Sequence, residues 1–183
     1  MELMRAIRHR RAIREFSGER VEDAAIERLI DAATRAPSAV NKQPWLFTVI
    51  RDRAMLDRIS AESKKHMLHM DTASQEFHAL LSDPQFHVFY HAPLLVVISA
   101  IRDDHWVKED AALAAENLML AAFAEGLGSC WIGFAQRWLE TSEGQSLIEV
   151  PDSYQPVAPI ILGHPKGHVP NIPRKRPQIN WIG

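Results

Sequence analysis

The feature that most constrains the fold is a continuous apolar run, Leu94 to Ala100, which follows Pro93. A strand that is apolar at successive positions has no face for solvent, so we expect a central strand covered on both sides. A second apolar segment follows at 111–124, where only Glu116 and Asn117 are polar. It predicts a helix buried on nearly every side. The segment is too short to cross a bilayer, so protein must cover it.

Many of the small residues in this helix would allow another helix to approach closely. They are the alanines at 111, 112, 114, 115, 121, 122 and 124. Two interpretations remain open: the approaching helix belongs to a second subunit, or the segment is the core helix of a monomer.

Composition and charge restrict the function classes. The chain has 183 residues, enough for one domain spanning 1–183, and its 46% hydrophobic and 24% charged shares are typical of soluble globular proteins. The net charge of −2 provides no basic field for nucleic acid or a membrane. One cysteine, Cys130, excludes an intrachain disulfide, and the charged N-terminus has no apolar core of a signal peptide. We therefore expect a cytoplasmic protein.

The remaining periodic segments predict alternating helices and strands. Helical spacing appears at 2–10, 23–35 and 51–65, and strand composition at 45–50. A short helix at about 141–149 and a last strand at 156–163 follow, and then a proline-rich extended arm at 164–183. Together with the apolar strand and helix, this pattern favours an α+β fold.

The stretch Ala36 to Trp45 joins a predicted helix to a predicted strand. It contains Ser38, Asn41 and Gln43 between two prolines, which restrict the backbone and disfavour helix before each of them. A stiff loop with hydrogen-bonding groups is suited to cradle a ligand. An ordinary turn between a helix and a strand is the alternative.

The run Arg10-Arg11-Ala12-Ile13-Arg14 places three arginines within five residues. Guanidinium groups form charge-assisted hydrogen bonds to phosphate. Positive charge is also favourable at a helix C-terminus, so a solvated basic patch is the competing interpretation.

A glycine-rich segment occupies 126–133 and reads Gly-Leu-Gly-Ser-Cys-Trp-Ile-Gly. It follows a helix and precedes a strand, the reverse of the order in a dinucleotide-binding fingerprint, so we reject that interpretation. The glycines instead indicate a helix end and a backbone that a ligand can approach. The flanks of Cys130 are apolar, which indicates a buried, unreactive thiol.

Five histidines lie in the segment 66–92, which raises the question of a metal site. His87 and His91 are four residues apart, as two ligands on one helix face would be. The segment has no cysteine, and no acidic residue stands at ligand spacing from that pair. We therefore expect structural or solvent-facing histidines and no metal.

Four separated segments resemble motifs of the nitroreductase family of FMN-dependent oxidoreductases. Residues 36–45 match Ala-Pro-Ser-x-x-Asn-x-Gln-Pro-Trp, and residues 126–133 match Gly-Leu-Gly-x-x-Trp-Ile-Gly. Residues 10–14 match Arg-Arg-Ser-x-Arg, except that Ala12 replaces serine and removes its hydroxyl. Arg174 and Arg176 match a basic pair that follows the last strand.

The resemblance implies a nitroreductase-like α/β sandwich with a central mixed, mostly antiparallel sheet flanked by helices. It also implies an intertwined homodimer with FMN at the interface, in which the loop of one chain reaches the flavin of the other. The implied cofactor-binding residues are Arg10, Arg11, Ala12, Arg14, Pro37, Ser38, Ala39, Asn41, Gln43, Trp131, Ile132, Gly133, Arg174 and Arg176. The four arginines other than Arg11 would converge on the FMN phosphate.

The implied activity is hydride transfer from NAD(P)H, through flavin N5, to an acceptor such as a nitroaromatic or a quinone. The flavin carries the chemistry, so no side chain is expected to be catalytic. The segment 66–92 would form a variable lid, with Phe86, Phe89 and Tyr90 lining the substrate pocket. Alternatives are reductive dehalogenation, enone or flavin reduction on the same scaffold, a non-catalytic flavin sensor, and a histidine-rich metal-binding module.

Overall fold

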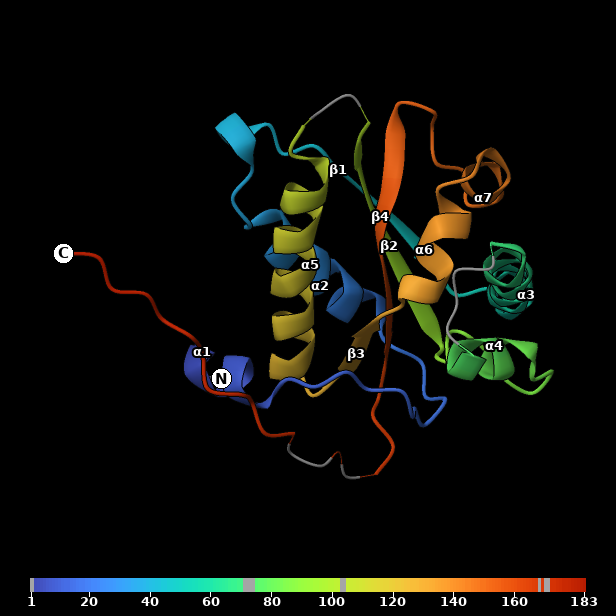
Figure 1. The fold of residues 1–183 in the computed structure, drawn as a ribbon, viewed down its shortest axis with the longest axis horizontal. Helices are drawn as coiled ribbons and strands as arrows, with labels where there is room; N and C mark the ends of the chain where they lie inside the picture. The colour runs from blue at the N-terminus through green and yellow to red at the C-terminus, as the bar shows by residue number, and fades with distance from the viewer. Residues whose placement is uncertain (1, 71–74, 103–104, 168, 170–171) are drawn as a thin grey trace.

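The centre of the molecule is a four-stranded sheet in the order β1-β2-β4-β3 (Figure 1). The structure is a computed structural model that describes residues 2–70, 75–102, 105–167, 169 and 172–183. The strands are β1 (Trp45–Ile50), β2 (Leu94–Ile101), β3 (Gly128–Trp131) and β4 (Tyr154–Gly163). Each neighbouring pair is antiparallel. Among the described residues, one parallel pairing adds to these, an isolated bridge between Ala12 and Ser129.

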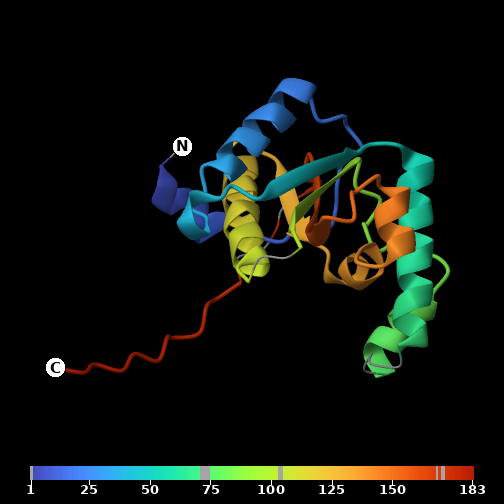
Figure 2. The same ribbon diagram turned by 90° about the horizontal axis from the view of Figure 1, so that it is seen from above.

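Helices cover both faces of the sheet. The helices are α1 (Leu3–His9), α2 (Asp23–Thr34), α3 (Arg53–His69), α4 (Gln75–Ser82), α5 (Val107–Ala124), α6 (Gly133–Leu139) and α7 (Ser142–Leu147), with a 3-10 turn, η1 (Ala39–Asn41). α2 and α5 lie on one side of the sheet, and α3 and α6 lie on the other (Figures 1 and 2). The predicted α+β sandwich with a mostly antiparallel sheet is confirmed.

Strand β2 is buried on both faces, as its apolar run predicts. Leu94, Val96 and Ile98 belong to the core cluster on the α2–α5 side. Leu95 and Val97 belong to the cluster on the α3–α6 side. Each cluster has its own set of helices, so β2 and β4 form the middle layer on which the molecule is built.

The central strand β4 contains two prolines, which cannot donate to a ladder. Pro159 lies opposite Val97, and the register between β2 and β4 shifts where Pro156 pairs with Ser99. Such a bulge places an extra residue in one strand and bends it. The bulge thus accommodates a proline inside a sheet that otherwise pairs regularly.

Helix α5 is less enclosed than its composition predicts. Its buried stripe includes Ala111, Ala114 and Leu118, whereas Leu113 has 45% of its surface exposed. The expectation of burial on nearly every side is therefore wrong for a single chain, because the sheet and α2 cover only one side of the helix. No helix among the described residues is long and apolar enough to cross a membrane.

Several element boundaries differ from the sequence expectation. Helix α3 continues to His69, so the first part of the predicted lid 66–92 is helical. Helix α6 was not predicted, and it begins at Gly133, directly after the short strand β3. Residues 71–74 of the lid and residues 168 and 170–171 of the arm lie outside the described residues.

Candidate active site

The basic segment 10–14 runs along the outer edge of the sheet. The Ile13 amide donates a hydrogen bond to the Ser129 carbonyl at 3.0 Å, next to the bridge that pairs Ala12 with Ser129. Ile13 packs directly on Gly128, where an added Cβ would lie 2.8 Å from its side-chain atoms. A glycine is therefore required at this position for the segment to reach β3.

A mostly apolar pocket of about 470 Å³ opens beside this segment. Its walls come from the N-terminal segment, α3, α4, the loop before β2, and the turn from β3 into α6. The lining residues are Arg14, Met67, Phe77, Leu80, Tyr90, Trp131, Ile132, Gly133 and Phe134. Arg14 is the only charged residue among these nine. We call this cavity the apolar pocket.

A chain of aromatic contacts forms one wall of the apolar pocket. Phe77 meets Phe134 edge to face at 5.5 Å between ring centroids, and Phe134 meets Phe86 at 6.1 Å. Phe86 meets Tyr90 at 5.7 Å, and the Arg14 guanidinium carbon lies 5.6 Å from the Tyr90 ring centroid. Edge-to-face pairs and cation–π contacts each contribute about 1 kcal/mol. They join α4, α6 and the N-terminal segment around the pocket.

A second, smaller cavity of about 240 Å³ lies at the other end of the basic segment. We call it the basic pocket. Its lining residues are His9, Arg10, Arg11, Ile13, Phe123, Gly126, Leu127, Gly128, Ser129, Pro165, Gly167 and Val169. The Arg10 Nε atom lies 3.3 Å from a carboxylate oxygen of Glu116. Arg11 donates to the carbonyls of Arg8 and Arg10, each at 2.8 Å.

The predicted cradle loop, residues 36–45, has an unusual backbone. Val40, Asn41 and Gln43 all have positive φ angles, of 45°, 55° and 51°. A β-branched residue such as Val40 rarely adopts this conformation. The Ser38 hydroxyl accepts a hydrogen bond from the Gln43 amide at 2.9 Å, which closes the loop on itself.

A buried carboxylate, Asp110, anchors the cradle loop to α5. One of its oxygens accepts a hydrogen bond from the Ala39 amide at 3.0 Å. Its backbone carbonyl accepts another from the Trp45 indole at 3.1 Å. Asp110 was not predicted as a site residue, because its acidic position in the first turn of an apolar helix equally fits the helix dipole.

The cradle loop and the basic pocket lie at opposite ends of α5. The η1 turn is beside the end at which α5 begins, whereas α1 and β3 are beside the other end (Figure 1). With a rise of 1.5 Å per residue, the helix separates Asp110 from Phe123, which lines the basic pocket, by roughly 20 Å. One chain therefore does not bring Pro37, Ser38, Ala39, Asn41 and Gln43 to the arginines of the basic segment.

Comparison with known proteins decides the family. A sequence model described as the nitroreductase family matches residues 7–164. The chain belongs to the nitroreductase family.

Individual proteins are similar to this chain over almost its whole length. A protein of Archaeoglobus fulgidus named "Putative NADH dehydrogenase/NAD(P)H nitroreductase" is 34% identical over 90% of this chain and 86% of its own. The iodotyrosine deiodinase of Haliscomenobacter hydrossis is 27% identical over 91% of this chain and 82% of its own. The structure of a Bacteroides fragilis nitroreductase with bound FMN superposes with a TM-score of 0.88 at 22% identity, covering all of both chains.

The motif residues of the basic segment and of the turn from β3 into α6 divide between the two pockets. Arg14, Trp131, Ile132 and Gly133 meet at the apolar pocket, and Arg10 and Arg11 meet at the basic pocket. Ala12 lies between the two pockets and pairs with β3.

The C-terminal arm lines the basic pocket only through its first part, with Pro165, Gly167 and Val169, and its described residues from 172 to 183 line neither pocket. Arg174 and Arg176 are exposed, and the segment 172–183 extends away from the packed layers in both views (Figures 1 and 2). The Lys166 amide donates to the Glu15 carbonyl at 2.9 Å, so the first part of the arm lies beside the basic segment, whereas Arg174 and Arg176 lie farther along it. The predicted convergence of these two arginines with Arg10 and Arg14 is therefore not present within one chain.

The three aromatic residues predicted to contact substrate have different environments. Tyr90 lines the apolar pocket, and Phe86 is half-buried and packs behind it on Phe134. Phe89 has 0% of its surface exposed and belongs to the core on the α3–α6 side. Phe89 therefore stabilises the loop, and the prediction that it lines the pocket is wrong. Met67, Phe77 and Leu80 also line the pocket and lie within the predicted lid 66–92, but they were not among the predicted substrate contacts. Phe134, from α6, lies outside the predicted lid.

Cys130 is buried on β3, as expected. Burial raises the pKa of its thiol and outweighs the opposing effect of the Arg14 and Arg10 charges. The apolar neighbours of Cys130 in the sequence gave no sign of these two arginines, which come close to the thiol only in the folded chain. The thiol nevertheless remains protonated near neutral pH, which disfavours a nucleophilic role.

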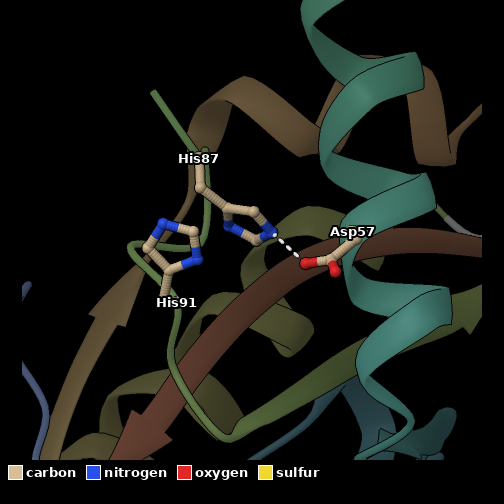
Figure 3. A group of neighbouring side chains, drawn as sticks. All are labelled: Asp57, His87 and His91. Carbon is tan, nitrogen blue, oxygen red and sulfur yellow. Dashed lines mark hydrogen bonds and ion pairs between the residues drawn. The ribbon is translucent and has the colours of Figure 1, made fainter. Parts of the chain in front are cut away.

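The structure brings Asp57 to the predicted histidine pair. The Nε2 atom of His87 lies 3.1 Å from an Asp57 oxygen, and the rings of His87 and His91 lie 4.6 Å apart (Figure 3). The three residues present ligand atoms within 4.8 Å of one another. Asp57 comes from α3, thirty positions earlier in the chain than His87. A search for acidic residues at local spacing therefore could not find it.

Proposed function

We propose that this nitroreductase-family protein binds FMN and transfers a hydride from NAD(P)H to a small-molecule acceptor such as a nitroaromatic or a quinone. The apolar pocket is the observation that carries the proposal. It combines an apolar, aromatic lining with one cation, Arg14, and with the backbone of residues 131–133. Few polar groups in a largely apolar cavity are typical of cofactor sites.

The residues present fit an FMN group on two counts. Nothing lies within 4 Å of the position that a Cβ on Gly133 would occupy, so this backbone faces open space that a flat ring can fill. The basic pocket lies at the other end of the same segment and supplies Arg10 and Arg11, which suit a phosphate. The ring would lie against residues 131–133 and Arg14, and the phosphate would lie in the basic pocket.

FMN, when bound, supplies the redox chemistry by accepting a hydride at N5 and passing it on. The side chains of this chain then have to bind, orient and exclude water. No carboxylate or histidine is present among the nine lining residues, and the Tyr90 phenol is the one hydroxyl among them. The Arg14 guanidinium, which lies at 5.6 Å over Tyr90, is placed to stabilise negative charge.

Replacement of Arg14 by alanine tests that role. We expect weaker FMN binding and a more negative flavin reduction potential, because the anionic reduced ring loses its cation. Equilibrium dialysis measures the affinity, and dye-linked reduction measures the potential. Arg137→Ala is a suitable control, since Arg137 is exposed on α6 and does not line the pocket. If both quantities are unchanged in Arg14→Ala, the arginine has no part in the site.

We further propose a homodimer in which the cradle loop of one subunit completes the flavin site of the other. The roughly 20 Å along α5 that separates the loop from the basic pocket of its own chain supports this arrangement. Large apolar side chains are also exposed on α1 and α5, including Leu3, Ile7 and Leu113. In such a dimer, Ser38, Asn41 and Gln43 would reach the partner's flavin.

The same arrangement would give the C-terminal arm a surface to cover. The arm exposes the apolar side chains of Ile179, Trp181 and Ile182. Their exposure to water is unfavourable, so covering them with a second subunit would stabilise the arm. If the arm lies on the second subunit, Arg174 and Arg176 can approach a phosphate site there. Light scattering during gel filtration tests the dimer, and deletion of 172–183 tests the arm through FMN affinity.

Reductive dehalogenation is the second candidate function, because one relative is an iodotyrosine deiodinase. The lining of the apolar pocket favours the first candidate. Iodotyrosine carries an ammonium group, and no acidic residue is present among the described residues that line the pocket. Parallel assays with a quinone and with iodotyrosine separate the two activities.

The visible spectrum of the purified protein tests the proposal directly. We expect the absorption of an oxidised flavin, which bleaches when NAD(P)H is added without oxygen and returns when benzoquinone follows. A bound flavin that does not bleach would indicate a sensor or another electron donor. A colourless protein that takes up no added FMN would exclude the proposal.

A further inference from the structure

A polar stripe on α3 holds the loop that precedes β2. The stripe consists of Arg53, Asp57, Ser60 and Lys64, which are spaced i, i+4, i+7 and i+11 and so share one helix face. Each of the four contacts the loop 83–91. The stripe therefore fastens the loop at successive points along its length.

The end of the stripe nearest α4 fixes the first half of the loop through backbone atoms. The Lys64 ammonium donates to the carbonyls of Asp83 and Phe86, the latter at 2.9 Å. The Ser60 hydroxyl, which is buried, accepts a hydrogen bond from the Val88 amide at 3.0 Å. These contacts place Phe86 through its backbone, and the Lys64 ammonium also lies 6.0 Å from the centroid of the Phe86 ring.

The other end of the stripe fixes the second half through two histidines (Figure 3). Asp57 meets His87 Nε2 at 3.1 Å, and Arg53 Nε lies 3.2 Å from the same carboxylate oxygen. Arg53 also donates to the His91 carbonyl at 3.3 Å and contacts the His91 ring. The guanidinium thus links the carboxylate on α3 to the residue that follows Tyr90.

Tyr90 sits between these fixed points in a left-handed conformation, with φ of 50°, and His91 has φ of 55°. An aromatic residue holds this conformation only when its surroundings impose it. We propose that the α3 stripe positions Phe86 and Tyr90 at the apolar pocket and thereby determines which acceptors fit. The acceptor part of this inference rests on the proposed function, whereas the positioning part does not.

A metal ion is the competing use of Asp57, His87 and His91, and the hydrogen bonds disfavour it. The Phe89 amide donates to His87 Nδ1 at 3.2 Å, so a neutral His87 carries its proton on Nε2 and donates to Asp57. A metal at Nε2 would require the proton on Nδ1, where it would face the Phe89 amide. Arg53 already places a positive charge between Asp57 and His91.

The hydrogen bond from the Phe89 amide to His87 Nδ1 makes the loop before β2 sensitive to protonation of His87. The groups that face His87 are Asp57 and Arg53 from α3 and His91 from its own loop. When His87 gains a second proton, Nδ1 can no longer accept from the Phe89 amide, and the loop loses a bond one residue before Tyr90. We therefore expect Tyr90 to change its environment in mildly acidic solution.

Fluorine NMR of protein labelled with fluorotyrosine tests the positioning without any need for flavin. The chain has two tyrosines, Tyr90 and Tyr154, so two signals are expected, and Tyr154→Phe assigns them. The Tyr90 signal should shift as the pH falls below 6.5, because burial lowers the pKa of His87 beneath that ordinary value, and the Tyr154 signal should not shift.

Variants on α3 complete this experiment. Arg53→Ala and Asp57→Ala should each move the Tyr90 signal at neutral pH and reduce its dependence on pH. Arg58→Ala is the matched control, because Arg58 is exposed on the same helix and, within the described part of the chain, forms no hydrogen bond or ion pair with the loop. A Tyr90 signal that is the same in all three variants would overturn the proposal.

Two further readouts separate the alternatives. In the flavin-loaded protein, Arg53→Ala should change the ratio of kcat/KM for menadione and benzoquinone by about threefold or more, with FMN content unchanged. An unchanged ratio with a displaced Tyr90 would overturn the specificity role alone, and a protein that binds no FMN would instead refute the proposed function. Binding of one equivalent of added Zn²⁺ that is lost in His87→Gln would overturn the proposal in favour of a metal site.

Discussion

Two loops of this protein adopt the same rare backbone conformation but are held in different ways. The cradle loop has Val40 and Asn41 at positive φ, and the loop before β2 has Tyr90 and His91 at positive φ. Each such residue costs about 1–2 kcal/mol. The first loop is fastened to α5 through Asp110, whereas the second is fastened by the whole α3 stripe.

The difference indicates whether each loop functions within its own chain or together with a second molecule. The loop before β2 is completed by its own chain, and it brings Tyr90 to a pocket of that chain. The cradle loop leaves Val40 with 87% of its surface exposed, so a single chain gives no reason for the strain. Strain without a local cause is expected where a second molecule completes the structure, which agrees with the proposed dimer.

The largest expected effect is a loss of stability when the buried aromatic side chain of the loop before β2 is removed. Phe89→Ala should reduce the free energy of unfolding by about 4 kcal/mol, because it empties a fully buried aromatic site. Tyr90→Ala, at the neighbouring position, should cost much less, since Tyr90 is only partly buried. Urea unfolding of both variants measures this contrast, and equal losses would contradict the assignment of Phe89 to the core.

Phe89 and Tyr90 also illustrate what the sequence can and cannot predict. The buried strand at 94–100 follows from its composition alone, and the structure confirms it. Composition does not predict which of several neighbouring aromatic residues is buried, because the left-handed turn at Tyr90 decides which ring points into the core. Backbone conformation of that kind depends on contacts with α3, so local patterns could not separate Phe89 from Phe86 and Tyr90.

The next effect concerns the anchor of the cradle loop. Asp110→Ala should destabilise the protein by about 2 kcal/mol, because the Ala39 amide loses a charge-assisted hydrogen bond. Glu109→Ala is the matched control: the acid is adjacent in the same helical turn but exposed, so its loss should cost less than about 0.5 kcal/mol. Hydrogen exchange at the Ala39 amide should also become faster in Asp110→Ala only. Similar behaviour of the two variants would show that Asp110 is no anchor.

The long-range partners are the part of the site that sequence reasoning missed. Asp110 binds a backbone amide 71 positions away, and Asp57 meets a histidine 30 positions away. The motif residues near the apolar pocket were found because they lie within short matched segments. A hydrogen bond between distant segments leaves no local spacing, so only the packed helices reveal these two carboxylates.

A smaller effect on stability depends on pH, and it is expected in the loop before β2 but not in the cradle loop. Burial, followed by the nearby His91, lowers the pKa of His87 below its ordinary value of 6.5, against the opposing effect of Asp57. A depressed pKa means that the folded state favours neutral histidine. This contribution to stability is present above pH 6.5 and is lost as the pH falls towards the folded-state pKa.

We therefore expect hydrogen exchange at the Val88 amide to accelerate as the pH falls through this range, after correction for the intrinsic rate. Exchange at Ala39 should not respond in the same way, because residues 37–44 contain no histidine. His87→Gln should remove the response, and His69→Gln, at an exposed position of α3, should retain it. A response that survives in His87→Gln would assign the titration to another group.

The smallest effect, and the one that tests the cradle loop most directly, is a gain in stability. Val40→Gly should relieve about 1–2 kcal/mol of backbone strain at a cost of about 0.5–1 kcal/mol in chain entropy, a net gain of about 0.5 kcal/mol. Val49→Gly is the contrasting control, because Val49 has ordinary strand geometry in β1 and its loss should destabilise. Urea unfolding at high dilution measures the stability of the single chain, and sedimentation at higher concentration measures its association.

If Val40 lies in the dimer interface, Val40→Gly should be more stable as a monomer and associate more weakly. Destabilisation of the monomer by Val40→Gly would mean that the strain is required within one chain, and the contrast between the two loops would disappear.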